Sequence, residues 1–193
     1  MTQTRHQQFQ TLFPNEPAFR WKQIEAGLFS SAKNWNELTT ISKSMRDALS
    51  VIPWMSVALE QIQVSGNGDT HKALLKVDCD KQIETVLMKN RRGAWTICVS
   101  SQVGCAMRCG FCATGKMGLT RNLTADEIVD QYRFWTDYLH SYNLQPNTSV
   151  FPRISNVVFM GMGEPLANYE EVKATLNTWL AHTDLGKTRI TVS

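Results

Sequence analysis

Three cysteines, Cys105, Cys109 and Cys112, lie within eight positions of this sequence, in the stretch GCAMRCGFCATG. Thiols three and four residues apart on one loop can converge on a single metal centre. A structural zinc site takes four ligands, whereas a [4Fe–4S] cluster held by three thiolates leaves one iron open for the amino and carboxylate groups of a bound molecule. The spacing therefore indicates an iron–sulfur cluster with an open iron. The alternative is a non-catalytic zinc-binding module with Cys98 as the fourth ligand.

A second motif follows an apolar run, in the stretch VVFMGMGEPL. Its polar end contains Gly161, Gly163 and Glu164, at the point where we expect a buried strand to stop. Ligands of open α/β folds bind outside the carboxyl ends of parallel strands. By itself a glycine turn after a strand is common, so the motif gains weight only in combination with the cysteines.

The two motifs together resemble a known family. The cysteine spacing, with Phe111 directly before Cys112, is similar to the signature of the radical-SAM superfamily. The longer stretches IETVLM (83–88) and CVSSQVGCAMRCGFCATGKMGLTRNLTADEIVDQ (98–131) resemble the RlmN/Cfr family of radical-SAM RNA methyltransferases, above all its RlmN branch. The resemblance covers about residues 15 to 193, weakly before residue 80 and densely after it.

This resemblance implies two cofactors and an activity. Cys105, Cys109 and Cys112 would hold a [4Fe–4S] cluster, and Gly163 and Glu164 would bind S-adenosyl-L-methionine (SAM). The enzyme would methylate C2 of an adenosine in 23S rRNA and in tRNA, although the Cfr branch modifies C8 and the sequence does not decide between the two carbons. The implied partners are these RNAs and a reducing electron donor such as flavodoxin.

The resemblance also assigns catalytic roles to two further residues. Cys98 would resolve a protein–RNA crosslink by forming a disulfide bond, and Glu84 would accept a proton. From the residues alone, Cys98 could instead be a small core residue of a strand. An outward-facing glutamate such as Glu84 is usually just solvated, so its catalytic role rests almost wholly on the resemblance. The methyl-carrying cysteine of the family lies late in the chain, whereas no cysteine follows Cys112 here. We therefore expect this sequence to be the N-terminal portion of a longer protein, without methyltransferase activity alone.

The elements that must position these residues divide the chain in two. Apolar spacing predicts helices over residues 17 to 50, and the polar stretch SGNGD predicts that this N-terminal helical accessory module ends at residue 64. The resemblance implies that the module (residues 1–64) engages RNA. Residues 65 to 193 then begin with a β-hairpin segment. Its strands are expected at 73–78, 83–89 and 95–100, with a turn at 90–94.

The remaining sequence alternates strands with helices. Thr124 and Glu127 predict a capping box at the start of one helix, and Asn168 and Glu171 predict another, whose buried face would hold Val172, Leu176 and Leu180. The apolar run 154–160 predicts a strand covered on both faces, and residues 188–192 a further strand. This βαβαβ order predicts an α/β fold with parallel strands. The resemblance makes it the first half of a radical-SAM partial (β/α) barrel; a small three-stranded α/β domain is the alternative.

Composition and charge bear on where the protein is found in the cell, but they do not indicate a binding partner. The 193 residues carry a net charge of only +3, which permits an acidic partner but does not indicate nucleic acid. No run approaches the roughly 18 apolar residues of a membrane span, and the first residues lack a signal-peptide core. We therefore expect no membrane association and a cytoplasmic protein, whose five cysteines stay reduced.

A few other residues receive weaker predictions. Cys79 matches no motif and is interpreted as an incidental thiol. Four basic residues are expected to flank the active face, where they could contact phosphates: Arg91, Arg92, Lys116 and Arg121.

Overall fold

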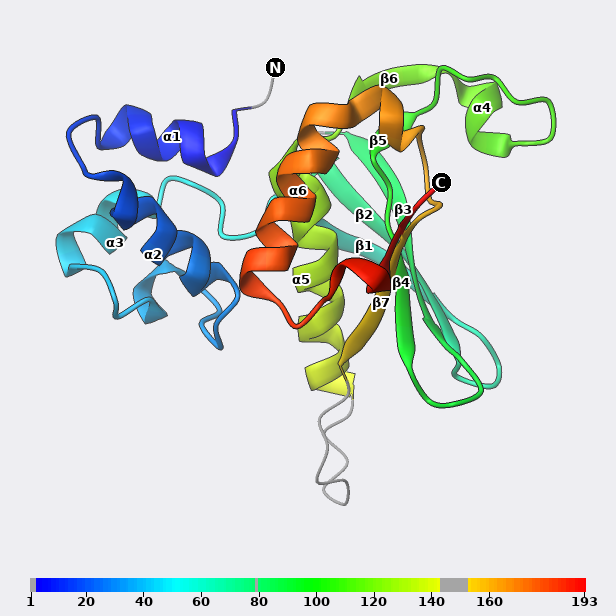
Figure 1. Ribbon diagram of the computed structural model, residues 1–193, viewed down its shortest axis with the longest axis horizontal. Coiled ribbons are helices and arrows are strands. Elements are labelled where there is room, and N and C mark those ends of the chain that lie inside the picture. The colour runs from blue at the N-terminus through cyan, green and yellow to red at the C-terminus, as the bar shows by residue number, and fades with distance from the viewer. Residues whose placement is uncertain (1–2, 79, 143–152) are drawn as a thin grey trace. The chain divides into compact units, whose positions relative to one another are not determined.

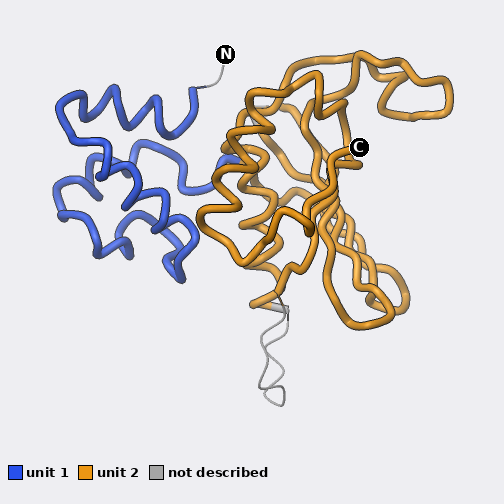
Figure 2. The backbone as a smooth tube through the Cα atoms, viewed as in Figure 1, with its two compact units in different colours: residues 1–56 blue, residues 57–193 orange. Residues whose placement is uncertain are grey.

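A computed structural model describes residues 3–78, 80–142 and 153–193 of the chain (Figure 1). It divides into two compact units, residues 1–56 and 57–193 (Figure 2). The sequence had predicted the first module to extend to residue 64. Residues 58–64 instead form strand β1 (Ala58–Val64), which is hydrogen-bonded to the next strand of the sheet and therefore belongs to the second unit.

The first unit is helical. It contains α1 (Arg5–Leu12), α2 (Ala18–Leu28), the short 3₁₀ helix η1 (Trp35–Glu37) and α3 (Lys43–Leu49), so the predicted helical region is broken into separate short elements. Capping side chains set the first residues of α1 and α3, because Thr4 and Ser42 accept backbone N–H groups of the first turns. These helices share one apolar core: Phe9, Ile24, Leu28, Trp35, Leu38, Ile41, Met45, Leu49 and Ile52.

The second unit is built on a six-stranded sheet. Its strands are β1, β2 (Thr70–Asp78), β3 (Lys81–Lys89), β4 (Trp95–Cys98), β7 (Ile154–Phe159) and β8 (Ile190–Val192), in that spatial order. The first four strands are antiparallel neighbours, whereas β4, β7 and β8 are parallel. The predicted α/β class and the parallel order of the last three strands are confirmed. The sheet is open, with β1 and β8 as its edges in the described part of the chain.

Two long helices cover one face of this sheet. They are α5 (Ala125–Tyr142) and α6 (Tyr169–His182), and both lie on the same side in Figure 1. The covered face is apolar, and Trp135 of α5 also donates a hydrogen bond from Nε1 to Oγ1 of Thr85, over 3.0 Å. The prediction that β7 is covered on both faces is wrong for the described residues, since Asn156 and Val158 are only half-buried on the other face. None of the described helices has the length and apolar character needed to cross a membrane.

The two predicted capping boxes have different outcomes. Thr124 and Glu127 exchange hydrogen bonds as predicted, so α5 begins with a capping box. Asn168 makes no capping bond to α6, because its amide instead donates to the carbonyl oxygens of Ser101 and Leu123. Of the residues predicted to face inward from α6, only Val172 is buried; Leu176 and Leu180 are half-exposed, and the other buried positions are Thr175 and Trp179.

The cysteine-rich segment lies outside the main sheet. Strands β5 (Gln102–Gly104) and β6 (Leu119–Asn122) form a separate two-stranded ribbon, and the chain between them contains the short helix α4 (Ala113–Met117). Two further 3₁₀ turns, η2 (Pro165–Asn168) and η3 (Lys187–Arg189), precede α6 and β8. In Figure 1 the ribbon and α4 lie beyond the end of the sheet where β4 and β7 stop.

Candidate active site

The segments that follow β4 and β7 lie against each other at the carboxyl ends of these parallel strands. The backbone N–H of Gly161 donates to the carbonyl oxygen of Val99 over 3.2 Å, and that of Ser101 donates to Met162 over 2.9 Å. Since β4 ends at Cys98 and β5 leads to Cys105, this contact brings the second motif close to the chain that carries the cysteines. Ligand sites of open α/β sheets occupy the same edge.

Close backbone contact explains the glycine at position 163. Gly163 has a φ of +101°, and a Cβ built on it would lie 2.6 Å from Cβ of Gln102. A larger residue would therefore be strained and would separate the two segments. The next residue, Glu164, is half-buried, and its Oε1 accepts the backbone N–H of Leu166 over 3.0 Å.

The cysteine loop is closed by backbone hydrogen bonds. The N–H of Cys105 donates to the carbonyl oxygen of Gly118, and that of Cys112 donates to Cys109, both over 3.0 Å. Gly104, with a φ of +79°, packs so tightly on the Gly118 carbonyl that no Cβ would fit. The loop therefore leaves the ribbon as a compact structure rather than as an extended chain.

The three thiols differ in their surroundings. Cys105 is buried, Cys112 is half-buried and Cys109 is exposed, and all three are free. A hydrogen bond from the backbone N–H of Gly115 lowers the pKa of the Cys112 thiol below its ordinary value. Cys79 lies outside the described residues.

The residue types of this loop fit an iron–sulfur cluster, but their positions do not yet form a ligand set. Three free cysteines on one closed loop have the donor chemistry that such a cluster requires. Within the described ranges, however, no three His, Cys, Asp or Glu side chains are close enough together to hold a metal ion. The same holds for a zinc site that would combine Cys98 with the three thiols of the loop.

Cys98 and Glu84 lie on the face of the sheet that α5 and α6 leave uncovered. Cys98 pairs with Val86 across the β3–β4 ladder, and Glu84 lies two residues from Val86, so all three side chains point to this face. Burial raises the pKa of the Cys98 thiol, and a hydrogen bond from the backbone of Met160 opposes this rise. Half of the Glu84 side chain is exposed, and its carboxylate accepts a hydrogen bond from Nζ of Lys72 over 2.7 Å.

Ser100 and Gln102 are two buried residues near the motifs that the sequence did not single out. Oγ of Ser100 donates to the carbonyl oxygen of Glu84 over 2.6 Å and accepts the backbone N–H of Met162 over 2.8 Å. Gln131 of α5 holds the backbone of Ser100 from the other side, over 2.8 and 2.9 Å. These partners are distant in sequence, so no local pattern pointed to them.

The expected positions of the basic residues are only partly observed. Arg91 and Arg92 lie in the turn before β4, at the opposite end of that strand from Cys98, so their predicted place beside the active face is wrong. The guanidinium group of Arg121 binds both carboxylate oxygens of Glu127, over 2.7 and 2.8 Å, and thus supports the start of α5. Lys116 is exposed on α4, within the cysteine loop.

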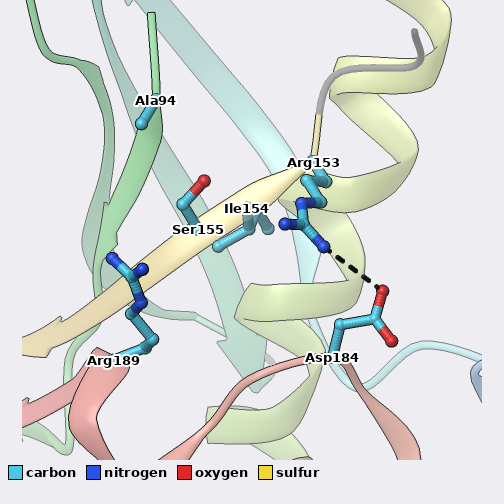
Figure 3. A pocket seen from close by; sticks show the side chains of 6 residues that line it. All are labelled: Ala94, Arg153, Ile154, Ser155, Asp184 and Arg189. Atoms are coloured by element: carbon cyan, nitrogen blue, oxygen red, sulfur yellow. Dashed lines mark ion pairs between the residues drawn. The ribbon is translucent and has the colours of Figure 1, made fainter. Parts of the chain in front are cut away.

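A small cavity of about 190 Å³ lies at the amino end of β7, away from this site. Figure 3 shows Arg153 and Arg189 on either side of Ser155. Arg153 and Asp184 form a loose ion pair with an N–O distance of 3.7 Å, and both side chains are largely exposed. Since the cavity lies at the end of β7 away from the glycine motif, it does not belong to the candidate active site.

Comparisons with known proteins were made by sequence and by structure. No model of a protein family matches the chain. A "Probable dual-specificity RNA methyltransferase RlmN" of Chloroflexus aurantiacus is 42% identical over 156 residues, which cover 80% of this chain and 40% of the relative. A relative with the same description from Chlorobium phaeobacteroides is 42% identical over 188 residues, covering 92% of this chain and 50% of the relative.

A solved structure is also similar. The crystal structure of a radical SAM methyltransferase from Sphaerobacter thermophilus matches with a TM-score of 0.81 and 33% identity, over 98% of this chain and 55% of that one. The chain thus spans about half the length of the curated relatives it matches.

Proposed function

Because the chain belongs to the RlmN-type family, we propose that it forms part of a radical-SAM enzyme that methylates RNA. The observation that supports this function best is the hydrogen-bonded contact between the segment after β4 and the glycine motif after β7. This contact joins a three-cysteine loop to a Gly–Glu turn at the edge of the sheet where α/β enzymes bind ligands. In the same proposal, the open sheet is the first part of a partial (β/α) barrel.

The chain's own residues have defined tasks in this proposal. Cys105, Cys109 and Cys112 hold a [4Fe–4S] cluster, and the turn at Gly163 and Glu164 binds the methionyl amino group of SAM. When bound, the cluster supplies the electron that cleaves SAM reductively. Since the sulfur atoms are not gathered in the described structure, cluster binding requires the loop from Cys105 to Gly118 to bring them together.

The proposed target is C2 of an adenosine in 23S rRNA and tRNA. This carbon is electron-poor and has no lone pair with which to attack a methyl sulfonium, so radical chemistry supplied by a cofactor is needed. The helical unit of residues 1–56 is the candidate RNA-engaging module, and a flavodoxin-like protein is the candidate electron donor. Reduced thiols fit a cytoplasmic location.

The uncovered face of the sheet supports the two catalytic assignments. In this proposal Glu84 accepts the proton lost from the adenine, a role supported by its half-exposed carboxylate on that face. Cys98 shares the face and provides the thiol that resolves the protein–RNA crosslink by forming a disulfide with the methyl-carrying cysteine. That second cysteine is not among residues 113–193, where the sequence contains none.

Anaerobic reconstitution tests the proposed function. The purified chain is incubated with iron, sulfide and reductant, its iron and zinc contents are measured, and electron paramagnetic resonance (EPR) spectra are recorded before and after SAM is added. We expect a reduced [4Fe–4S] signal that changes with SAM. A cluster signal that SAM leaves unchanged would reject the proposed enzyme. Zinc bound by four thiolates, which gives no EPR signal, would reject it as well and favour the zinc-binding RNA module.

A further inference from the structure

The side chain of Gln102 lies between the two parts of the candidate active site. It is only 1% exposed. Its Oε1 accepts the backbone N–H of Glu164 over 2.8 Å, and its Nε2 donates to Oδ1 of Asn122 over 2.7 Å. Both ends of one amide group are therefore used, each by a different segment of the chain.

The two segments are the ones that carry the proposed cofactor ligands. Asn122 is the last residue of β6 and pairs with Gln102 across the ribbon, whose two strands flank the cysteine loop. Glu164 ends the glycine motif after β7. The Gln102 amide thus connects the base of the cysteine loop to the Gly–Glu turn.

Packing leaves little freedom for this connection. The backbone N–H of Gln102 donates to the Met162 carbonyl oxygen over 3.2 Å, and Gly163 packs on Cβ and Cγ of the glutamine so closely that an added Cβ would lie within 2.8 Å of both. A small change in the Gln102 side chain will therefore move the turn or leave the backbone N–H of Glu164 without its acceptor.

We propose that Gln102 is a positioning residue, which sets the distance between the cluster-holding loop and the turn that binds SAM. This inference rests on the function proposed above. An amide suits the task because one end accepts and the other donates. An apolar side chain of equal length keeps the volume and loses both bonds. A carboxylate keeps the bond to Glu164, and it can also accept from the Asn122 amide once that amide has rotated.

The experiment compares Gln102→Met with Gln102→Glu in the reconstituted chain. We expect Gln102→Met to keep its iron content but to bind SAM about tenfold more weakly in an EPR titration, a change equivalent to one lost hydrogen bond. Gln102→Glu restores most of the affinity. Asn122→Ala, at an exposed position, removes the hydrogen bond to Gln102 from the other side, and we expect it to weaken SAM binding as well.

Two further measurements separate positioning from a general loss of stability. Hydrogen exchange in the metal-free chain reports on the Glu164 N–H directly, and we expect faster exchange in Gln102→Met. Thr175→Val serves as the control, because Thr175 is fully buried and its hydroxyl donates to the carbonyl oxygen of Glu171, away from the glycine motif and from residues 99–102. It should lower the melting temperature and leave the SAM dissociation constant unchanged.

The possible results either support or overturn the inference about Gln102. Wild-type affinity for SAM in both Gln102→Met and Asn122→Ala would overturn the inference and leave the proposed function intact. Equal weakening by Thr175→Val would overturn it as well, since the effect would then be one of stability. A wild-type cluster that does not respond to SAM would refute the proposed function, and the inference with it.

Discussion

Cys98 and Glu84 lie on the same face of the open sheet, on neighbouring strands and two positions apart in register. The helices α5 and α6 pack on the opposite face, where Ile83, Leu87 and Ile97 are fully buried. A thiol and a carboxylate can therefore approach one bound molecule from the same side of the sheet. One face of the sheet therefore carries the candidate catalytic side chains, and the opposite face forms the apolar core.

Cys98 is not a metal ligand in this account, so Cys98→Ser should keep the full iron content after anaerobic reconstitution. Replacement of Cys105, Cys109 or Cys112 by alanine should reduce the iron content severalfold, because each removes one of only three thiolates. Iron and sulfide analysis of the four variants measures this directly. A loss of metal from Cys98→Ser equal to that from the loop variants would indicate a four-thiolate site.

Because Cys98 is partly buried, we expect the stability of the protein and the reactivity of this thiol to depend on pH. Because its pKa is raised, the thiol is favoured in the folded protein, and this contribution to stability is present at neutral pH and lost as pH rises through the raised pKa. Alkylation by iodoacetamide, followed by peptide mass spectrometry, should give Cys98 a midpoint above that of the same cysteine in urea. A midpoint at or below the unfolded value would contradict the assignment.

Thr85 connects the core to the strand that carries Cys98. Its Oγ1 accepts from Trp135 Nε1 over 3.0 Å and donates to the Cys98 carbonyl oxygen over 2.8 Å. Thr85→Val removes the acceptor of the buried Trp135 Nε1 and one donor to the Cys98 carbonyl oxygen, so the free energy of unfolding in urea should fall by about 1–3 kcal/mol. Thr85→Ser retains the hydroxyl and should lose only about 0.8 kcal/mol, the value of one buried methyl. Equal losses in the two variants would show that the hydroxyl contributes nothing.

Gly163 should not tolerate a side chain. Gly163→Ala places an L residue at a φ of +101° and forces its Cβ against Gln102, which we expect to cost about 1–3 kcal/mol in the free energy of unfolding. Gly66→Ala is the matched control, because no atom lies within 4 Å of the added Cβ. Urea titration of both variants provides the comparison. Similar stabilities would mean that the turn adapts without cost.

Local patterns in the sequence predicted much of the fold. The alternation of apolar and polar residues gave the hairpin strands, and the pair Thr124 and Glu127 marked the start of α5 correctly. The corresponding pair at α6 failed because Asn168 has better partners in Ser101 and Leu123, which are distant in sequence. Capping signals describe only local competition for hydrogen bonds, and a long-range acceptor overrides them.

In the candidate site, too, local sequence patterns predicted some features, whereas contacts between distant residues could not be predicted. Cysteine spacing and the glycine motif identified the segments that meet at the ends of β4 and β7, but not the residues that join them. Serine and glutamine are residue types that are common in exposed loops, and only the folded chain shows that Ser100 and Gln102 are buried. The position of Arg91 and Arg92 could have been predicted, because the turn at 90–94 precedes β4 and therefore lies at the amino end of that strand, away from the carboxyl end where ligands bind.

The central claim is that a cluster held by Cys105, Cys109 and Cys112 leaves one iron open, to which SAM binds. Electron–nuclear double resonance on the reduced, reconstituted chain tests it most directly, with SAM labelled isotopically at the amino nitrogen. We expect a hyperfine coupling between that nitrogen and the cluster. A reconstituted [4Fe–4S] cluster without such coupling at saturating SAM would contradict it.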